Sequence, residues 1–254
     1  MRIFTKSLYR FALALGVKPN KAVRILAPGR YADSLRKWKQ SGGDITKTYK
    51  ILTDFGESAG MARGHYFHQD LWVARLIHEA NPERHIDVGS RIDGFVAHVA
   101  AIRKIEVMDI RPLGDVPHEN MNFIQHDLME LTDSDLQTDS ISCLHAIEHF
   151  GLGRYGDPID PQGHMKAFKN IISMLRPGGT LYISFPIADQ DEVHFNAHRA
   201  FCPTRIFDWP DADRLSLKRF DYVGDDGDLY TDEVPRNLPE GMRFACGIYC
   251  FEKH

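Results

Sequence analysis

Short apolar, strand-like segments alternate with helix-like segments from residue 85 onward, and this alternation constrains the fold more than any other feature. The segment 85–90 is apolar and ends in turn residues, and the segments 104–110 and 122–127 carry an acid at or near their ends. A helix-like stretch at 93–102 lies between the segments 85–90 and 104–110, and Asp93 is its expected N-cap. Strands alternating with helices predict a largely parallel sheet with helices on both faces.

The rest of the chain extends the same pattern. Further strands are expected at 140–147, 180–186, 215–223 and 243–251. The last two are expected to pair like a hairpin and to close the sheet edge. Between the strands expected at 140–147 and 180–186, an apolar stripe predicts a helix at 160–175, with Asp160 as N-cap and Pro161 at the first position. Upstream, a helix is expected at 69–80, ending at Asn81-Pro82, and a strand at 48–55.

The N-terminal arm is strongly basic, although the formal net charge of the chain is −4. Residues 1–40 hold ten Lys/Arg and a single acid, Asp33, with aromatic and aliphatic residues interleaved. Such an arm suits an anionic membrane surface or an acidic partner, or it folds against the acidic body of its own chain. With Ser41-Gly42-Gly43 as a linker, we expect a basic helical N-terminal extension over 1–45 and one domain over 46–254.

The composition favours a reduced, cytoplasmic protein. The four cysteines, Cys143, Cys202, Cys246 and Cys250, form no C-x-x-C pair. No apolar run approaches the roughly 20 residues that span a bilayer, and no small-residue cleavage site follows FALALGV, so a secretory signal is not expected. Peripheral contact with the inner face of a membrane through residues 1–40 stays open.

Three acids follow successive predicted strands, at the sheet edge where ligands of such folds bind. Asp109 stands 20 positions beyond Gly89, the place from which a carboxylate accepts both hydroxyls of a ribose. Asp127 follows the next strand and could receive an exocyclic amine, while Asp87 precedes the glycine turn. This register predicts an adenosine pocket.

The segments HIDVGSRIDGF, IEVMDI, FIQHDL, ISCLHAIEHF and LRPGGTLYISFP, in this order, resemble the motifs of class I S-adenosylmethionine-dependent methyltransferases. The resemblance covers residues 70–254 and implies an α/β fold, a doubly wound Rossmann-like sheet of seven strands with an antiparallel last strand. It implies S-adenosylmethionine as cofactor, held by Asp87, Gly89, Ser90, Gly94, Asp109, Asp127 and His145. Within the superfamily, DVGS, DIRPL, EHFGLGRYGDP and FNAHRAF resemble a smaller, uncharacterised methyltransferase-like family.

The glycine loop departs from the family pattern, acid-x-Gly-x-Gly-x-Gly. Arg91 and Asp93 replace its second and third glycines, and Gly94 comes one position late. Glycines at these places let the backbone approach the methionine part of the cofactor. In their absence, the Arg91 guanidinium could pair with the methionine carboxylate.

The segment 145–149 reads HAIEH, which on a helix could hold zinc beside a general base. The residues before it are β-rich, and FGLGRYG after it has three glycines, so both flanks are poor helix formers. On a strand followed by a turn the two histidines diverge, and no metal ligand is expected. A zinc hydrolase using His145, Glu148 and His149 is kept as an alternative.

Methyl transfer is a direct displacement that needs an aligned acceptor, and an alcohol acceptor benefits from a base. His149 and His198 are co-candidates for this base, with Glu148 as their orienting carboxylate. Four residues are candidates for binding the acceptor: Arg154, His194, Asn196 and Arg199. The Arg154 guanidinium suits a phosphate or carboxylate. The alternative is a purely structural turn in which Arg154 pairs with Asp157.

We therefore expect an S-adenosylmethionine-dependent methyltransferase acting on a small-molecule or carbohydrate-like acceptor, with oxygen as the methylated atom. The polar His/Asn/Arg loop and the basic arm both suit polysaccharide biosynthesis. A nucleic-acid substrate is disfavoured because the body of the chain is acidic. A non-catalytic Rossmann-like module of a membrane-associated biosynthetic complex is the second alternative.

Overall fold

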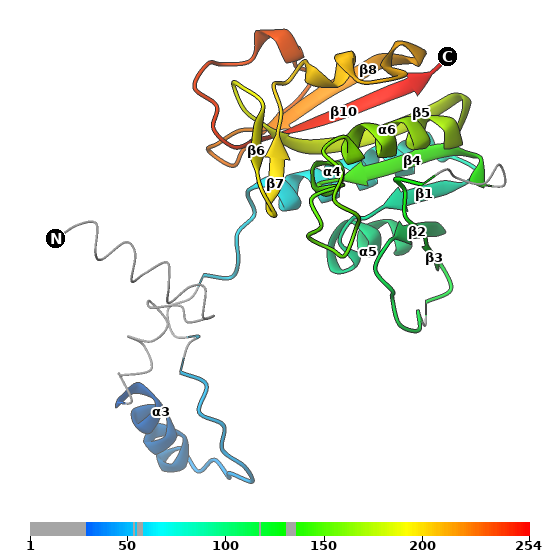
Figure 1. Cartoon of the computed structure of the whole chain (residues 1–254). Helices are drawn as coiled ribbons and strands as arrows, with labels where there is room; N and C mark the ends of the chain where they lie inside the picture. The colour runs from blue at the N-terminus through cyan, green and yellow to red at the C-terminus, as the bar shows by residue number, and fades with distance from the viewer. Residues whose placement is uncertain (1–28, 53, 55–57, 117, 131–135) are drawn as a thin grey trace. The chain divides into compact units, whose positions relative to one another are not determined.

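The computed structural model describes residues 29–52, 54, 58–116, 118–130 and 136–254. The chain divides into two compact units between Met61 and Ala62, drawn in Figure 1. The domain boundary expected at 45/46 stays a prediction. Most of the basic arm, residues 1–28, lies outside the described residues.

The described part of the first unit contains one helix, α3 (Gly29–Gln40), with Lys37 and Lys39 in its last turn. The backbone N–H of Ser41 donates to Lys37 O and that of Gly43 to Trp38 O, both at 3.0 Å. The segment 41–43 is thus a turn that ends the helix as well as a connection. The strand expected at 48–55 is wrong for the described residues 48–52 and 54, which form no strand. Ile51 is 61% exposed, so this apolar run is not covered by other residues.

The second unit is built on a central sheet with the order β3-β2-β1-β4-β5-β10-β8-β9 (Figure 1). Its strands are β1 (His85–Val88), β2 (Ile105–Asp109), β3 (Met121–Gln125), β4 (Thr138–Leu144), β5 (Leu175–Ile187), β8 (Leu215–Val223), β9 (Leu229–Tyr230) and β10 (Ala245–Lys253). Strands β1 to β5 run parallel, whereas β10 is antiparallel to both β5 and β8. The order reverses between β1 and β4, and ligands of such sheets bind above this point.

The strands predicted from residue 85 onward are confirmed, with two differences. The resemblance implies seven strands, and the described sheet has eight because the two-residue β9 pairs with the outer side of β8. The strands β8 and β10 do pair, but β10 lies inside the sheet between β5 and β8 and does not form its edge. A separate hairpin, β6 (Glu192–His194) and β7 (His198–Ala200), follows β5.

Two long helices cover opposite faces of this sheet. Helix α4 (His65–Ala80) begins four residues before the predicted start and ends at Asn81, which adopts a left-handed φ of 45°. Helix α6 (Gly163–Met174) begins three residues later than expected, with Gln162 at the N-cap position. Asp160 instead accepts the backbone N–H of Gln162 at 2.8 Å. The short 3₁₀ turns are η3 (Ile147–His149), η4 (Arg205–Asp208), η5 (Ala212–Arg214) and η6 (Pro235–Asn237).

The helix expected at 93–102 is broken. It consists of a π-type turn, η1 (Ile92–Val96), and a four-residue helix, α5 (Ala97–Ala100). Gly94 has φ −125° and ψ −109°, which no helix contains, and Arg91 occupies the N-cap position expected for Asp93. The irregular backbone brings Gly94 against Asp70 of α4, where an added Cβ would lie 2.6 Å from Oδ2.

The hydrophobic core forms two layers, one on each face of the sheet. On one face α6 buries Phe168, Ile171 and Ile172 completely against strand residues. On the other, α4 and the η1–α5 segment bury residues such as Val73 and Phe95. Each fully buried side chain of this size contributes about 1.5–3 kcal/mol. All four cysteines are free thiols, as expected.

Candidate functional site

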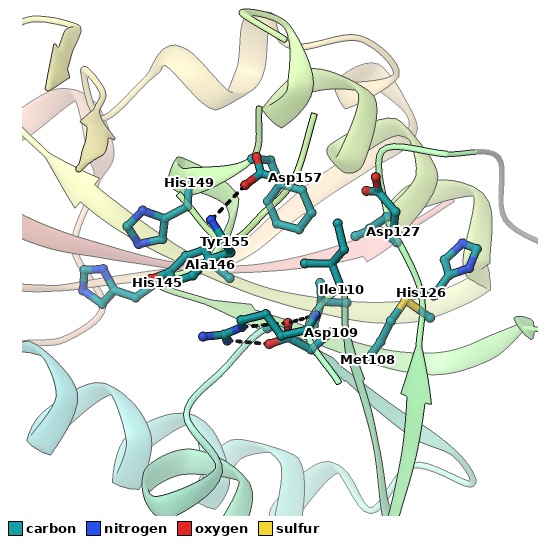
Figure 2. Close-up of a pocket in the computed structure, with 15 residues that line it drawn as sticks. Met108, Asp109, Ile110, His126, Asp127, His145, Ala146, His149, Tyr155 and Asp157 are labelled. Carbon is teal, nitrogen blue, oxygen red and sulfur yellow. Dashed lines mark hydrogen bonds and ion pairs between the residues drawn. The ribbon is translucent and has the colours of Figure 1, made fainter. Parts of the chain in front are cut away.

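A cavity open to solvent, with about 560 Å³ of empty space that includes its solvent-filled mouth, lies above the carboxyl ends of β1, β2, β3 and β4, where the strand order reverses. Figure 2 shows the side chains around it, with Asp109 and Asp127 following neighbouring strands. Apolar walls come from residues such as Val88, Met108 and Ala146. The two carboxylates therefore share one hollow, which is what an adenosine pocket requires.

The carboxylate of Asp109 is already engaged by the side chain two positions later. Arg111 Nη2 lies 2.6 Å from Oδ2 and Arg111 Nε lies 3.0 Å from Oδ1, while the Arg111 backbone N–H also donates to Oδ1 at 2.8 Å. The hydrogen bonds with Asp109 raise the pKa of Arg111. The guanidinium in turn lies over the Tyr155 ring, 4.4 Å from its centroid.

Asp127 lies one strand further along the same edge. Its Oδ1 accepts the backbone N–H of Met129 at 2.9 Å. The backbone N–H of His126 donates to Asp109 O at 3.1 Å, so the ends of β2 and β3 are tied together. This bond holds the two acids at a fixed spacing across the cavity.

Asp87 lies beneath the cavity and does not line it. It is fully buried. Its carboxylate accepts hydrogen bonds from Ser90 Oγ at 2.7 Å, from Ser90 N at 3.1 Å and from Ser142 Oγ at 2.5 Å. Ser142 Oγ also lies 3.1 Å from His85 Nε2, and His85 Nδ1 lies 2.8 Å from Ser140 Oγ. Burial raises the pKa of Asp87 to about 6 and lowers that of His85 to about 3. This buried network supports the turn after β1.

Gly89 forms that turn and lines the cavity with a positive φ of 69°. A Cβ at this position would lie 3.0 Å from the Cβ of Ala146, so the chain approaches β4 closely here. Of the residues that replace the family glycines, Arg91 pairs with Asp93 at 3.2 Å and lies over the Tyr66 ring at 5.1 Å. Arg91 lines the cleft that adjoins the cavity, and the Asp93 side chain is 80% exposed.

A second cleft, with about 740 Å³ of empty space that includes open solvent, adjoins the cavity. The two share five lining residues: Gly89, Arg111, His145, His149 and Tyr155. Beyond this border the cleft is lined by residues of α4, of β7 and of the segment before β10, among them His65, His198 and Phe244. A ligand in the cavity and one in the cleft would meet at the two shared histidines.

A buried carboxylate lies between these histidines. Glu148 is 1% exposed, and its Oε1 lies 2.9 Å from His145 Nδ1 and 3.6 Å from His149 Nε2. His145 adopts a left-handed φ of 49° at the end of β4, and Glu148 follows in the 3₁₀ turn η3. The HAIEH segment is therefore a strand end and a turn, as its flanking residues predict. Burial opposes a charge on His145, but Cys246 and Glu148 outweigh it and raise the pKa of His145 well above its usual range.

The two histidines predicted as bases both line the cleft. His149 Nδ1 lies 2.7 Å from Ala197 O and donates to it, which leaves Nε2 with its lone pair. Burial lowers the pKa of both His149 and His198, so both favour the neutral form. His198 Nε2 is buried and has no hydrogen-bond partner in the described part of the chain.

Of the predicted acceptor-binding residues, only Arg154 lines the cleft, and it donates to Ala197 O at 2.9 Å. Arg199 is 3% exposed and donates to Glu148 O and Phe150 O, so it fixes the loop from below. The other two lie on the β6–β7 hairpin outside the lining: His194 pairs with Glu192 at 2.6 Å, and Asn196 occupies the hairpin turn.

The alternative Arg154–Asp157 pair is not what holds the glycine-rich loop. Asp157 instead accepts the backbone N–H groups of Gly151, Gly153 and Tyr155, at 2.8, 3.2 and 3.1 Å. The loop is thus a rigid turn closed on one carboxylate. The guanidinium of Arg154 is left at the cleft.

Sequence reasoning missed several residues of the site. His65 and Tyr66 open α4, which begins four residues before the predicted helix start, and Phe244 immediately precedes β10; all three line the cleft. Burial lowers the pKa of His65 to about 4, and the neighbouring His145 is the second cause of this shift. Arg111 stood two positions after Asp109 in the sequence, and this spacing was the one available signal for their ion pair.

The strand order, with an antiparallel strand inserted next to β5, defines the class I methyltransferase fold. Solved structures agree. The chain matches the small RNA methyltransferase HEN1 with a TM-score of 0.54 at 15% identity, covering 84% of this chain and 27% of that one. It matches an O-methyltransferase of a Brevibacillus brevis multienzyme in complex with S-adenosyl-L-homocysteine, with a TM-score of 0.50 at 13% identity, covering 72% and 71%.

The [4+2]-cyclase SpnF has a similar fold as well, with a TM-score of 0.51 at 12% identity, covering 92% of this chain and 96% of that one. The shared fold alone therefore does not define the reaction. A family model described as "Caenorhabditis protein of unknown function, DUF268" matches residues 120–209. No curated protein matches the chain significantly. Within the described residues, no helix has the length and apolar character to cross a membrane.

Proposed function

We propose that this chain transfers a methyl group from S-adenosylmethionine to a hydroxyl of a small-molecule or carbohydrate-like acceptor. The observation that carries the proposal is the common cavity of Asp109 and Asp127 at the reversal of strand order, which opens into a histidine-lined cleft. The cavity suits a nucleoside and the cleft suits a polar acceptor.

The cavity residues fit the cofactor. Asp109 would accept the ribose hydroxyls and Asp127 the adenine amine, between apolar walls formed in part by Val88 and Ala146. The turn at Gly89 lets the backbone approach the ligand, and Ser90 and Arg91 face the adjoining cleft, where Arg91 suits the methionine carboxylate. When bound, S-adenosylmethionine supplies an electrophilic methyl group.

In the cleft, His149 is the best placed base. Its Nδ1–H is held by Ala197 O, so its Nε2 is free to take the proton of an acceptor hydroxyl. Glu148 Oε1, 3.6 Å from Nε2, would stabilise the imidazolium that forms. His198 lines the same cleft and is the second candidate, with Nε2 as the atom that takes the proton.

The charge of the cleft suggests the kind of acceptor. Arg91, Arg111 and Arg154 all line it, and the buried Glu148 lies among its histidines. Guanidinium groups pair with carboxylates and phosphates in two-point geometry. A sugar or other small hydroxylated molecule that carries a phosphate or carboxylate would fit this set.

Binding of S-adenosylhomocysteine to the full chain, measured by isothermal titration calorimetry, tests the proposal. We expect saturable binding at micromolar concentration, and titration of adenosine alone should give weaker binding at the same site. Absence of heat at high micromolar S-adenosylhomocysteine would overturn the proposal and favour a non-catalytic Rossmann-like module. The cytoplasmic location and membrane contact through residues 1–40 stay predictions.

A further inference from the structure

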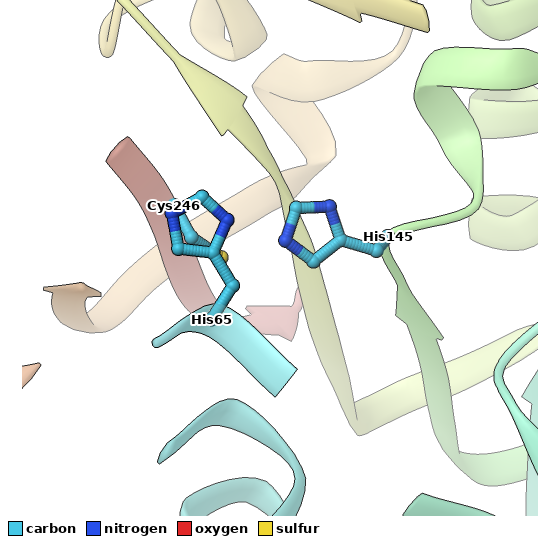
Figure 3. Close-up of side chains that lie close together, drawn as sticks. All are labelled: His65, His145 and Cys246. Atoms are coloured by element: carbon cyan, nitrogen blue, oxygen red, sulfur yellow. The ribbon is translucent and has the colours of Figure 1, made fainter. Parts of the chain in front are cut away.

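Three potential metal ligands from distant parts of the chain meet beside the second cleft. His65 opens α4, His145 follows β4, and Cys246 lies in β10. Each offers one ligand atom, and the three atoms lie within 4.8 Å of one another. In Figure 3 a nitrogen of each imidazole faces the other ring, and the sulfur lies beside them.

His145 is oriented as a metal ligand is. Glu148 Oε1 lies 2.9 Å from its Nδ1, so Nδ1–H donates to the carboxylate and Nε2 is the nitrogen left for a metal. Nε2 carries a proton in the charged form of the ring and a lone pair once that proton has left. The side chain is 5% exposed, and Nε2 has no hydrogen-bond partner in the described residues. A carboxylate on the far nitrogen is the arrangement that fixes the tautomer of metal-binding histidines. The left-handed backbone of His145, which is unfavourable for a residue with a Cβ, aims the ring in this direction.

His65 is held in a similar way. Its ring is stacked on that of His145 with centroids 5.2 Å apart and planes 8° apart. The Phe244 ring also packs against the His65 ring, with centroids 5.2 Å apart. Stacking thus positions the His65 ring, a hydrogen bond to Glu148 positions the His145 ring, and a nitrogen of each faces the other ring (Figure 3).

Cys246 completes the set from strand β10. The residue is fully buried, and its Sγ lies 3.5 Å from Gln69 Oε1 and 3.8 Å from Gly247 O. A thiol donates its proton weakly to such oxygens. On metal binding the S–H bond of Cys246 and the Nε2–H bond of charged His145 both break and the two protons leave to solvent. The thiolate and the freed imidazole lone pair then bind the ion.

We propose that His65, His145 and Cys246 bind one Zn²⁺ ion. Nitrogen and sulfur ligands suit zinc, whereas Mg²⁺ and Ca²⁺ prefer oxygen. Three protein ligands leave a fourth position, and His65 and His145 both line the second cleft, so this position faces the cleft. The site differs from the H-x-x-E-H arrangement, because Glu148 orients His145 and His149 is not a ligand. It does not depend on the proposed methyl transfer.

The test is the metal content of the full chain, purified without a polyhistidine tag or chelator, loaded with Zn²⁺ and dialysed. We expect one zinc per chain by mass spectrometry. Cys246→Ser and His65→Gln should each lower the zinc content at least tenfold. Two matched controls, Cys250→Ser in the same strand and His68→Gln in the same helix, should keep it. Glu148→Gln should weaken affinity about 10–100-fold, as loss of an orienting partner does.

Cobalt provides a second readout that does not depend on zinc content. The Co²⁺-loaded wild type and Cys250→Ser should show a thiolate-to-cobalt charge-transfer band in the near ultraviolet, and folded Cys246→Ser should lack it. Circular dichroism shows whether each variant is folded. If a variant is not folded, the zinc content and cobalt spectrum of the wild type decide the test. Wild-type protein with neither stoichiometric zinc nor the cobalt band would overturn the proposal. Zinc retained in both Cys246→Ser and His65→Gln would overturn it equally.

Discussion

Asp109 and Arg111 form a two-point ion pair at the edge of the cavity, with Nη2–Oδ2 and Nε–Oδ1 distances of 2.6 and 3.0 Å. The pair fixes the direction of the Asp109 carboxylate, which is 14% exposed, before any ligand arrives. It also makes Arg111 part of the wall between the cavity and the cleft. A ribose at this site would thus meet a carboxylate that needs no reorientation.

Asp109→Ala should weaken binding of S-adenosylhomocysteine about 10–100-fold, because it removes hydrogen bonds to a charged acceptor worth about 1.5–3 kcal/mol. Titration calorimetry measures the change. Asp115→Ala, in the exposed segment after β2, is the matched control and should bind as the wild type does. Equal affinities of the two variants would mean that the ribose does not contact Asp109.

Gly89→Ala should both destabilise the fold and weaken ligand binding. A left-handed backbone costs a residue with a Cβ about 1–2 kcal/mol, and the new Cβ would lie 3.0 Å from Ala146. Gly178→Ala has a similar φ of 78° with no atom within 4 Å, so it isolates the backbone term. In urea denaturation Gly89→Ala should be the less stable variant. Gly178→Ala should keep wild-type affinity for S-adenosylhomocysteine, and loss of affinity in both variants would contradict a local effect.

Arg199→Met should destabilise the second unit by about 3 kcal/mol. The substitution leaves the carbonyls of Glu148 and Phe150 without their buried donor, and an unsatisfied buried acceptor costs about 1–3 kcal/mol. Arg205→Met is the control, because its pairs with Asp191 and Asp208 are solvent-exposed and such pairs contribute about 0–1 kcal/mol. Equal denaturation midpoints for the two variants would rule out a supporting role for Arg199.

The buried pair beneath the cavity predicts an unusual pH dependence. The folded pKa of His85, about 3, lies below its usual 6.5, so His85 stabilises the fold above pH 6.5, and this contribution is lost as pH falls. The folded pKa of Asp87, about 6, lies above 3.8, so its contribution is lost as pH rises toward 6. Between pH 4 and 6 the two slopes, each about 1.4 kcal/mol per pH unit, cancel.

Asp87→Asn should therefore reveal the contribution of His85. As pH is lowered from 6 to 4, the unfolding free energy of the variant should decrease by ~1.4 kcal/mol per pH unit relative to wild type. The reason is that the slope from Asp87 has been removed while the opposite slope from His85 remains. Urea denaturation across this range measures the difference. Parallel stability curves for wild type and variant would show that Asp87 does not titrate in this window.

The strands could be predicted because each is a short apolar run bounded by turn residues, and the positions of Asp109 and Asp127 followed from their register. The role of Asp87 could not. Its place before the glycine turn is the same whether the side chain faces a ligand or, as here, two serine hydroxyls below it. The sequence alone does not reveal which face a strand-end acid occupies.

The broken helix and the cysteine–histidine cluster escaped prediction for a different reason. The backbone at Gly94 departs from a helix beside Asp70, and no local pattern near residue 94 contains that information. Likewise, His65 and Cys246 approach each other only because α4 packs beside β10. Contacts between residues so far apart in sequence depend on the completed sheet.

The inner position of β10 has a consequence for synthesis on the ribosome. Strands β1 to β5 can associate as they emerge, but β8 and β9 cannot join them until residues 245–253 fill the gap beside β5. Until that moment one border of the nascent sheet is unpaired and the Cys246 sulfur has not reached the two imidazoles. Completion of the sheet and assembly of the sulfur-containing cluster would therefore both wait for the synthesis of β10.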